Sequence, residues 1–302
     1  MNKYILVIGS SNTDMVLKAA RFPKPGETIL GGDFFMFQGG KGANQAVAAA
    51  RLSSQVSFIC KVGQDLFGNN AIKHYSNEKI NTEYIIQTRD APTGVALITI
   101  NAEGENEIVV ASGANALLSV QDLAVLDTVL RNADYFLTQL ETPLAIVEYL
   151  AAYAHDNQKY LILNPAPAAE ISPAVYKGLF LITPNETEAE LLTGISVTNE
   201  NTAKESVRVF KSRGVLNIII TMGSQGAYAA TESFEGMITT SKVKAVDSTA
   251  AGDVFNGALV VALSENKPWK DAVEFACRAA AISVTKMGAQ SSAPFRNELD
   301  LS

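Results

Sequence analysis

The segment at residues 245–253 carries the residue types best suited to chemistry. Its sequence, AVDSTAAGD, predicts a short strand and a turn of small residues, followed by an apolar helix over residues 254–263. Backbone N–H groups at the start of a helix lack partners within the helix and favour an anion such as phosphate. Asp253 places a carboxylate at the same point, which suggests a general base beside a bound phosphate. A helix charge with no catalytic role is the alternative.

Other polar side chains come directly after predicted strands or at the start of a predicted helix. They are Asn12, Asp14, Glu141, Asn185, Glu188, residues 39–44 (GGKGAN) and residues 221–226. The carboxyl ends of parallel strands converge on one crevice, where amides and carboxylates can bind the hydroxyls of a sugar. Each residue alone also fits a turn or capping role, so the prediction depends on their convergence.

Several common catalytic and cofactor motifs are absent from the sequence. Lys41 is followed by glycine and lacks the upstream spacing of a G-x-x-x-x-G-K-[ST] motif, and no G-x-G-x-x-G follows the first strand. Neither H-E-x-x-H nor C-x-x-C occurs. A P-loop or dinucleotide-binding protein is therefore unsupported. His74 and His155 lie in helical stretches of mixed polarity, where we expect surface or boundary residues rather than catalysts.

Short apolar runs alternate with helical patterns along most of the chain. The predicted strands lie at residues 4–8, 56–62, 135–140, 160–163, 179–182 and 217–222. The predicted helices lie at residues 42–52, 144–155, 187–192, 204–213, 254–263 and 271–285. Such apolar strands fit a sheet covered on both faces. The alternation predicts an α/β fold with a mainly parallel central sheet and helices on both faces.

Two segments, residues 15–37 and 94–112, break this alternation. The first holds the sequence FPKPG and a Gly-Gly pair between strand-like pieces, and the second has the pattern of a hairpin. Together they could form a small sheet that projects from the main body and serves as a lid over the site. Ordinary hairpins at the sheet edge are the alternative. We therefore expect one domain over residues 1–302 with a β lid.

The composition indicates a globular protein. The chain has 302 residues, 47% hydrophobic and 18% charged, with a net charge of −7, which argues against a nucleic-acid partner. Cys60 and Cys277 match no metal or redox spacing and are expected as buried thiols in a reducing compartment. The start of the chain does not resemble a signal peptide, and no run is long enough to span a membrane. These features predict a soluble, cytoplasmic protein.

The chain resembles the ribokinase-like (PfkB) family of carbohydrate kinases over nearly its full length. The resemblance rests on an ordered set of motifs, each weak alone: residues 9–14 (GSSNTD), 22–28 (FPKPGET), 39–46 (GGKGANQA), 139–143 (QLETP), 163–167 (LNPAP), 183–188 (TPNETE), 246–253 and 288–292 (GAQSS). The resemblance implies a large α/β domain with a small β lid that often forms a dimer. It also implies a phosphotransferase that uses ATP to phosphorylate the 5-hydroxyl of ribose.

By the same resemblance, Asp253 is the base, and Ala250, Ala251 and Gly252 offer N–H groups to the transferred phosphoryl group. The sugar would be held by Asn12, Thr13, Asp14, Gly40, Lys41, Gly42, Ala43, Asn44, Glu141 and Asp253. The nucleotide would contact Asn185, Thr221, Met222, Gly223, Ser224, Gln225, Gly226, Gly252 and Asp253. Cys277 is expected at the edge of the adenine pocket or, equally, as a packed core residue.

The resemblance also implies two kinds of metal ion. Mg²⁺ would accompany ATP, with Glu188 on its side of the site. A monovalent activator, usually K⁺, would be held by Asp247, Thr249, Ser283, Lys286, Gly288 and Ser292, several through backbone oxygens. Asp247 could instead be an ordinary strand-end residue bound to backbone N–H groups.

The sequence departs from the common family pattern DTxGAGD at two positions. Ser248 replaces the threonine and keeps a hydroxyl, while Ala250 replaces the first glycine. Ala250 is tolerable if its φ angle is negative, and alanine there favours the ribose-specific branch. A kinase for deoxyribose, another sugar or a nucleoside is the alternative, and a non-catalytic sugar-binding regulator is a third. The intact Asp253 and its turn count against the regulator.

Overall fold

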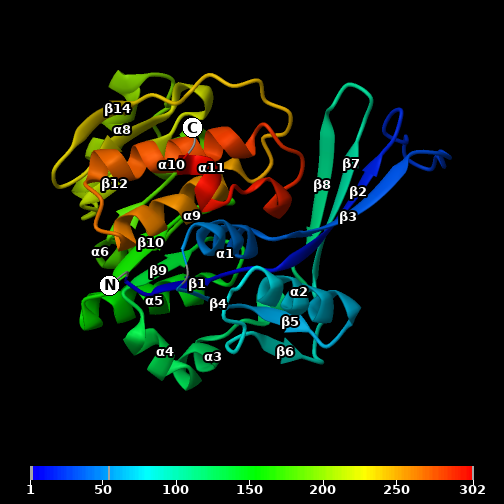
Figure 1. Cartoon of the computed structure of the whole chain (residues 1–302), viewed down its shortest axis with the longest axis horizontal. Coiled ribbons are helices and arrows are strands. Elements are labelled where there is room, and N and C mark those ends of the chain that lie inside the picture. The colour runs from blue at the N-terminus through cyan, green and yellow to red at the C-terminus, as the bar shows by residue number, and fades with distance from the viewer. Residues whose placement is uncertain (1–2, 54, 301–302) are drawn as a thin grey trace.

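A central eight-stranded sheet organises the computed structural model, which describes residues 3–53 and 55–300 (Figure 1). Its strands, in spatial order, are β14 (Glu235–Ile238), β13 (Ala227–Ala230), β12 (Asn217–Thr221), β11 (Leu181–Ile182), β10 (Tyr160–Leu163), β9 (Tyr135–Thr138), β1 (Ile5–Ile8) and β4 (Val56–Ile59). Pairing is parallel from β12 to β4 and antiparallel at β13 and β14. The predicted α/β class is confirmed.

Helices cover both faces of this sheet and divide the core in two. One core packs α1 (Lys41–Leu52), α9 (Ala251–Ser264) and α10 (Trp269–Ser283) against one face, together with α2 (Leu66–Asn77). The other core holds α3 (Val120–Val125), α4 (Asp127–Asn132), α5 (Leu144–Asn157), α6 (Pro173–Gly178), α7 (Glu186–Thr193) and α8 (Glu200–Ser212). Alternate residues of β1 enter opposite cores, as the two-residue period of a strand requires.

A second, four-stranded sheet extends away from the main body (Figure 1). Its order is β3 (Asp33–Gly39), β2 (Asn12–Lys18), β7 (Gly94–Ile100) and β8 (Asn106–Ala111). The β2–β7 pair is parallel, and the other two pairs are antiparallel. The hairpin expected at residues 94–112 is confirmed, whereas the first segment begins earlier than expected, at Asn12. A short sheet of β5 (Lys61–Gly63) and β6 (Ile86–Thr88) completes the strands.

Two sequence-based assignments near the site were wrong. Residues 56–62 are not one strand: β4 ends at Ile59, and the Cys60 carbonyl accepts the N–H of Ile86, which transfers pairing to another sheet. The short strand expected before Asp247 is also missing. The N–H groups of Val246 and Asp247 donate instead to the Val284 carbonyl just after α10, at 2.7 and 3.2 Å.

Three further features concern the cysteines, membrane-spanning helices and the end of the described chain. Both cysteines are free and buried, as expected. Burial raises the pKa of the Cys277 thiol to about 12. Within residues 3–53 and 55–300, no helix has the length and apolar character of a membrane span. A final short helix, α11 (Arg296–Asp300), and three 3-10 turns complete the described chain, the last of them η3 (Gln290–Ser292).

Close packing of α1 against α9 brings the predicted base to its neighbours. Gly257 lies one turn beyond Asp253, and a Cβ atom there would approach the Cβ of Ala48 to 2.7 Å and the carbonyl of Gln45 to 2.8 Å. Glycine therefore sets the distance between the two helices.

We expect Gly257→Ala to lower the free energy of unfolding by about 1–3 kcal/mol, because the added methyl group must push α1 and α9 apart. Denaturant-induced unfolding measures the change. Intrinsic helix propensity alone predicts the opposite sign, a gain of about 1 kcal/mol from replacing glycine by alanine. A more stable variant would therefore contradict the packing argument.

Candidate functional site

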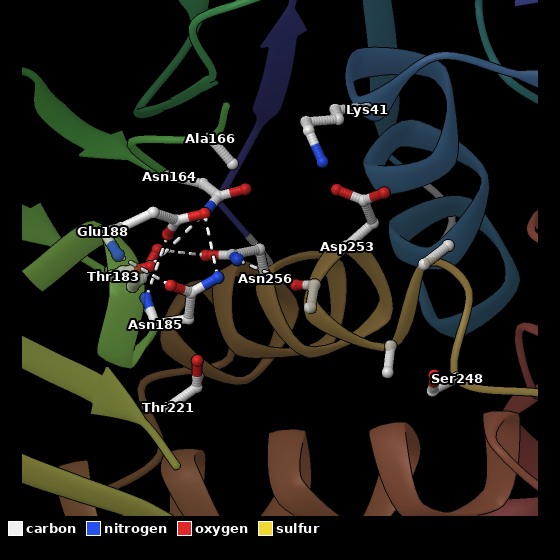
Figure 2. A pocket seen from close by; sticks show the side chains of 13 residues that line it. Lys41, Asn164, Ala166, Thr183, Asn185, Glu188, Thr221, Ser248, Asp253 and Asn256 are labelled. Atoms are coloured by element: carbon white, nitrogen blue, oxygen red, sulfur yellow. Dashed lines mark hydrogen bonds between the residues drawn. The ribbon is translucent and has the colours of Figure 1, made fainter. Parts of the chain in front are cut away.

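A cavity of about 170 Å³ lies at the carboxyl ends of the central strands (Figure 2). Its walls come from the ends of β10, β11 and β12 and from the starts of α1, α7 and α9. The lining residues are Lys41, Asn164, Ala166, Thr183, Asn185, Glu188, Thr221, Ser248, Ala250, Ala251, Gly252, Asp253 and Asn256. This is the edge at which open α/β sheets bind ligands.

The start of α9 forms one wall of the cavity. Ala250 is the N-cap residue, and no side chain caps the first turn within the described chain. The Ala251 N–H donates to the Ser248 carbonyl at 3.2 Å, so it is less available for a ligand than expected. Beside Gly252 there is open space, with no atom within 4 Å of a Cβ built there. The helix therefore presents its positive end to the cavity.

Ala250 contradicts the expectation of a negative φ angle. Its φ is +60° and its ψ is 13°, the left-handed conformation that glycine adopts without strain. The methyl group makes this conformation cost about 1–2 kcal/mol.

Asp253 lies on this first turn but does not cap its own helix. Its side chain is 5% exposed, and its two oxygens accept hydrogen bonds from α1: Oδ2 from Asn44 Nδ2 at 2.9 Å and Oδ1 from Gln45 Nε2 at 3.0 Å. Figure 2 shows the Lys41 side chain facing it. Burial raises the pKa of the Asp253 carboxyl, whereas Lys41, Asn44 and Gln45 oppose that rise. The result is a desolvated carboxylate suited to accept a proton.

The residues expected to bind a sugar gather where β2 meets α1. Burial, together with the neighbouring Glu141 and Asp253 carboxylates, raises the pKa of Asp14 to about 6. The Asp14 side chain covers Gly39 so closely that a Cβ on that residue would collide with it. Gly40, with φ of +89°, lets the chain enter α1 directly.

Of three more expected sugar-side residues, Glu141 and Asn12 have side-chain hydrogen-bond partners in the described part of the protein, whereas Thr13 does not. Glu141 Oε2 accepts the Lys41 N–H at 2.9 Å and the Ser10 hydroxyl, so this oxygen anchors the start of α1. Asn12 Oδ1 accepts from Asn115 Nδ2 at 2.8 Å. The Thr13 hydroxyl is buried and has no hydrogen-bond partner in the described chain. Gly42 and Ala43 are buried in the first turn of α1 and contribute backbone only.

The residues expected on the nucleotide side begin with a capping box. Asn185 Oδ1 accepts the Glu188 N–H at 2.8 Å, and Glu188 Oε2 accepts the Asn185 N–H at 2.9 Å. Glu188 is only 6% exposed, and burial raises the pKa of its carboxyl to about 7. Thr221 pairs with Asn185 as an isolated bridge, which brings β12 to this wall.

The rest of the nucleotide-side set lies further away. Met222 is buried, and Gly223, Ser224 and Gln225 form an exposed 3-10 turn that ends at Gly226. Cys277 is buried in α10 and does not line the cavity. Its carbonyl accepts the Thr240 hydroxyl at 3.4 Å.

The segment expected to bind a monovalent cation is organised by Asp247. Its Oδ1 accepts the Thr249 N–H and its Oδ2 the Gly288 N–H, both at 2.9 Å. These bonds lower the pKa of Asp247 against the effect of burial, which raises it. The Asp247 carboxylate therefore joins the segment before α9 to the segment after α10.

The other residues of that set offer mainly backbone oxygens. The hydroxyls of Ser283 and Ser292 donate to carbonyls of their own turns, and Lys286 Nζ forms an ion pair with Glu298. Among residues 3–53 and 55–300, no cluster of three or more His, Cys, Asp or Glu side chains could hold a metal ion.

Several residues of the site were absent from the sequence-based set. Asn164 and Thr183 line the cavity, as does Asn256, and Gln45 binds Asp253. Thr183 donates to Asn256 Oδ1 at 2.6 Å, and Gln45 Nε2 also donates to Asn164 Oδ1 at 3.0 Å. Asn164 and Thr183 come directly after predicted strands, the same signal that identified Asn185.

The whole chain is similar to known carbohydrate kinases in sequence and in structure. A model of the "pfkB family carbohydrate kinase" family matches residues 2–296. A ribokinase of Haemophilus influenzae is 44% identical, over 99% of this chain and 97% of its own. A deoxyribokinase of Salmonella typhi is 37% identical, over 96% of this chain and 95% of its own. The structure of Arabidopsis thaliana ribokinase complexed with ribose and ATP has a TM-score of 0.91 and 29% identity, and the match covers 100% of this chain and 98% of that one.

The left-handed backbone conformation of Ala250 has a consequence for stability. We expect Ala250→Gly to raise the free energy of unfolding by up to about 1 kcal/mol, because relief of the strained φ angle outweighs the added entropy of the unfolded glycine. Ala152, exposed in the middle of α5, is the matched control. There the same substitution should destabilise by about 1 kcal/mol. Equal losses at the two positions, measured by denaturant unfolding, would contradict strain at Ala250.

Proposed function

The chain belongs to the pfkB family of carbohydrate kinases, and we propose that it uses ATP to phosphorylate the 5-hydroxyl of D-ribose, giving ribose 5-phosphate and ADP. The observation that carries this proposal is the buried Asp253 carboxylate at the open start of α9. A candidate base and an anion-binding helix terminus therefore lie within one turn of α9. Phosphoryl transfer to an alcohol requires both.

In the reaction that we propose, the ribose 5-oxygen attacks the γ-phosphorus of ATP and its proton passes to Asp253. A bond forms between that oxygen and the γ-phosphorus, and the bond from the γ-phosphorus to the β,γ-bridging oxygen breaks to release ADP. Of the three N–H donors expected at Ala250, Ala251 and Gly252, that of Ala251 is bonded to the Ser248 carbonyl, so those of Ala250 and Gly252 would stabilise the charge on the transferred group. Because burial raises the pKa of Asp253, the carboxylate is a stronger base than one in water.

Sugar recognition in this proposal belongs to the polar residues at the start of β2 and α1. Asn12, Asp14 and Asn44 are the candidates for the 2-hydroxyl, and Lys41 is a further expected sugar-side residue. Each offers directional donors or acceptors. Loss of the 2-hydroxyl would leave such buried groups unpaired, which is how a site of this kind discriminates ribose from deoxyribose. The relative named deoxyribokinase makes 2-deoxyribose the competing substrate.

The donor chemistry of the site fits the two proposed metal ions. Glu188, a buried carboxylate on the cavity wall, suits Mg²⁺, which prefers oxygen ligands and binds together with nucleotide phosphates. When bound, Mg²⁺ would neutralise phosphate charge. The carbonyl-rich segments joined by Asp247 suit K⁺. The residues that we propose for it are Asp247, Thr249, Ser283, Lys286, Gly288 and Ser292.

The projecting sheet is proposed as both a lid and a dimer contact. It exposes large apolar side chains, among them Phe34 (58%), Met36 (47%), Leu97 (54%) and Val109 (68%). Exposed apolar strands in a soluble protein usually mark an interaction surface. A second copy of the chain would cover this face, and the lid would exclude water from transfer. A cytoplasmic location completes the proposal, supported by the two free, buried thiols.

A substrate panel tests the proposed activity. With ATP and Mg²⁺, we expect ADP release to be fastest with D-ribose and slower with 2-deoxyribose, arabinose, fructose and nucleosides. The Asp253→Asn variant should lose turnover by roughly 10²–10⁴-fold, the usual contribution of a general base, and should still bind both substrates in calorimetry. Near wild-type turnover by Asp253→Asn would refute the assignment of Asp253 as the base. A faster rate with 2-deoxyribose than with D-ribose would refute D-ribose as the preferred substrate.

Exchange of K⁺ for Na⁺ at constant ionic strength tests the cation site. We expect lower turnover in Na⁺, because carbonyl oxygens spaced for the larger ion bind the smaller one less well. An Asp247→Asn variant, which keeps the size of the side chain, should weaken the dependence on K⁺. Equal rates of the wild-type protein in the two salts would refute this site without affecting the proposed phosphorylation of ribose.

A further inference from the structure

Gln290 connects the outer helix α2 to the side chains around Asp253. Its Nε2 atom donates to Asn44 Oδ1 at 3.1 Å, and its Oε1 atom lies 2.9 Å from His74 Nε2. Asn44 Nδ2 in turn donates to Asp253 Oδ2 at 2.9 Å. Gln290 is 3% exposed, whereas His74 is half-buried on α2. A continuous series of hydrogen bonds therefore runs from the surface of α2 to the proposed base.

Every amide in this series has one orientation that satisfies its neighbours. An amide oxygen only accepts, so His74 must donate its Nε2 proton to Gln290 Oε1. That leaves the Gln290 NH₂ group toward Asn44 Oδ1, and the Asn44 NH₂ group toward the carboxylate. If Gln290 were reversed, Asn44 would follow, and its oxygen would face the oxygen of Asp253. The orientation of Gln290 thus determines whether Asp253 receives a donor or a second acceptor.

The backbone of Gln290 is held as firmly as its side chain. Arg51 donates from its Nη1 atom to the carbonyls of Gln290 and Ala293, at 2.8 and 2.7 Å. Its Nε and Nη2 atoms bind Glu78, the C-cap residue of α2, at 2.8 and 2.6 Å. The arginine and glutamate side chains are only 9% and 14% exposed. The same ion pair therefore fixes η3, which carries Gln290, against the helix that carries His74.

We propose that Gln290, oriented by His74, is a positioning residue that sets the direction of the Asn44 amide and thereby aligns Asp253 for proton transfer. This inference rests on the proposed function, because it assigns Asp253 the role of base. Gln290 does not line the cavity, so its effect passes through Asn44. We call the hydrogen bonds from His74 through Gln290 and Asn44 to Asp253 the relay. The second oxygen of Asp253 is held independently by Gln45, so loss of the relay should misalign the carboxylate without releasing it.

Gln290→Glu tests the relay, because the new carboxylate still accepts from His74 and keeps the backbone contacts of Arg51. In its ionised form it cannot donate to Asn44, whose amide should then reverse. We expect turnover at saturating ribose to fall at least roughly tenfold, as expected when one hydrogen bond at the base is lost. The KM for ATP should stay within about twofold of wild type, a threshold small beside a tenfold effect. Gln87→Glu, at an exposed position of β6, is the matched charge control and should retain full turnover.

A double-mutant cycle separates this role from a merely structural one. In an Asn44→Ala background, Gln290→Glu should cost less than about twofold, because the intermediary is gone. An undiminished penalty in that background would overturn the relay, as would wild-type turnover by a folded Gln290→Glu variant. If Gln290→Glu does not fold, His74→Phe, with His155→Phe as its control, should show a loss that likewise vanishes in the Asn44→Ala background.

One measurement needs no turnover and so distinguishes the relay from the proposed function. The side-chain NH₂ resonance of Asn44, assigned by its absence in Asn44→Ala, should shift in Gln290→Glu and not in Gln87→Glu. An unshifted resonance would refute the relay even in an active kinase. A wild-type protein that fails to phosphorylate ribose, but whose Asn44 resonance shifts as expected, would refute only the proposed function.

Discussion

The cost of burying the Asp253 charge explains how the site around it is built. A carboxylate that is 5% exposed loses most of its hydration, and the protein compensates with two amide donors from α1 and with Lys41 opposite. Amides satisfy the oxygens without neutralising the charge. A direct guanidinium partner would stabilise the charged form further and make the carboxylate a weaker base. Neutral donors therefore suit the role proposed for Asp253, in which the carboxylate stays ionised and then accepts a proton.

That arrangement requires α1 to be placed accurately, and three contacts do so. Glu141 accepts the Lys41 N–H at the helix start, Gly257 allows close approach to α9, and the Gln290 side chain binds Asn44 from the opposite side. Each contact comes from a distant part of the sequence. The geometry of Asp253 is consequently a property of the whole domain, even though Asp253 and the turn before it are adjacent in the chain.

The sequence predicted most of the α/β alternation, because buried parallel strands are continuous apolar runs with a strong local signal. It also pointed to Asn185 and Asp253, which line the cavity at the starts of α7 and α9, where turn chemistry is visible. Asp14 and Asn44, within β2 and α1, do not line the cavity, and their sugar-binding role stays a prediction. The positive φ of Ala250 was missed, since a single alanine carries no local signal of strain. Gln45, Asn256 and Gln290 were missed because they lie within turns of helix, and their importance comes only from tertiary contacts. The strand expected before Asp247 failed because Val284 competes for its N–H groups.

The charges around the cavity also constrain how a nucleotide can bind. Asp14, Glu141 and Asp253 lie around Lys41, and Glu188 lies on the far wall, so acidic groups outnumber the lysine. The start of α9 offers only about half a positive charge. A triphosphate bound there would face several carboxylates with little positive charge from the protein, which supports the proposal that Mg²⁺ accompanies it. The raised pKa values of Asp14, about 6, and Glu188, about 7, reduce the repulsion further, because both groups are partly protonated near neutral pH. In the proposed function, the acidic groups assigned to bind the sugar and accept its proton would therefore also favour ATP with its metal ion over bare ATP.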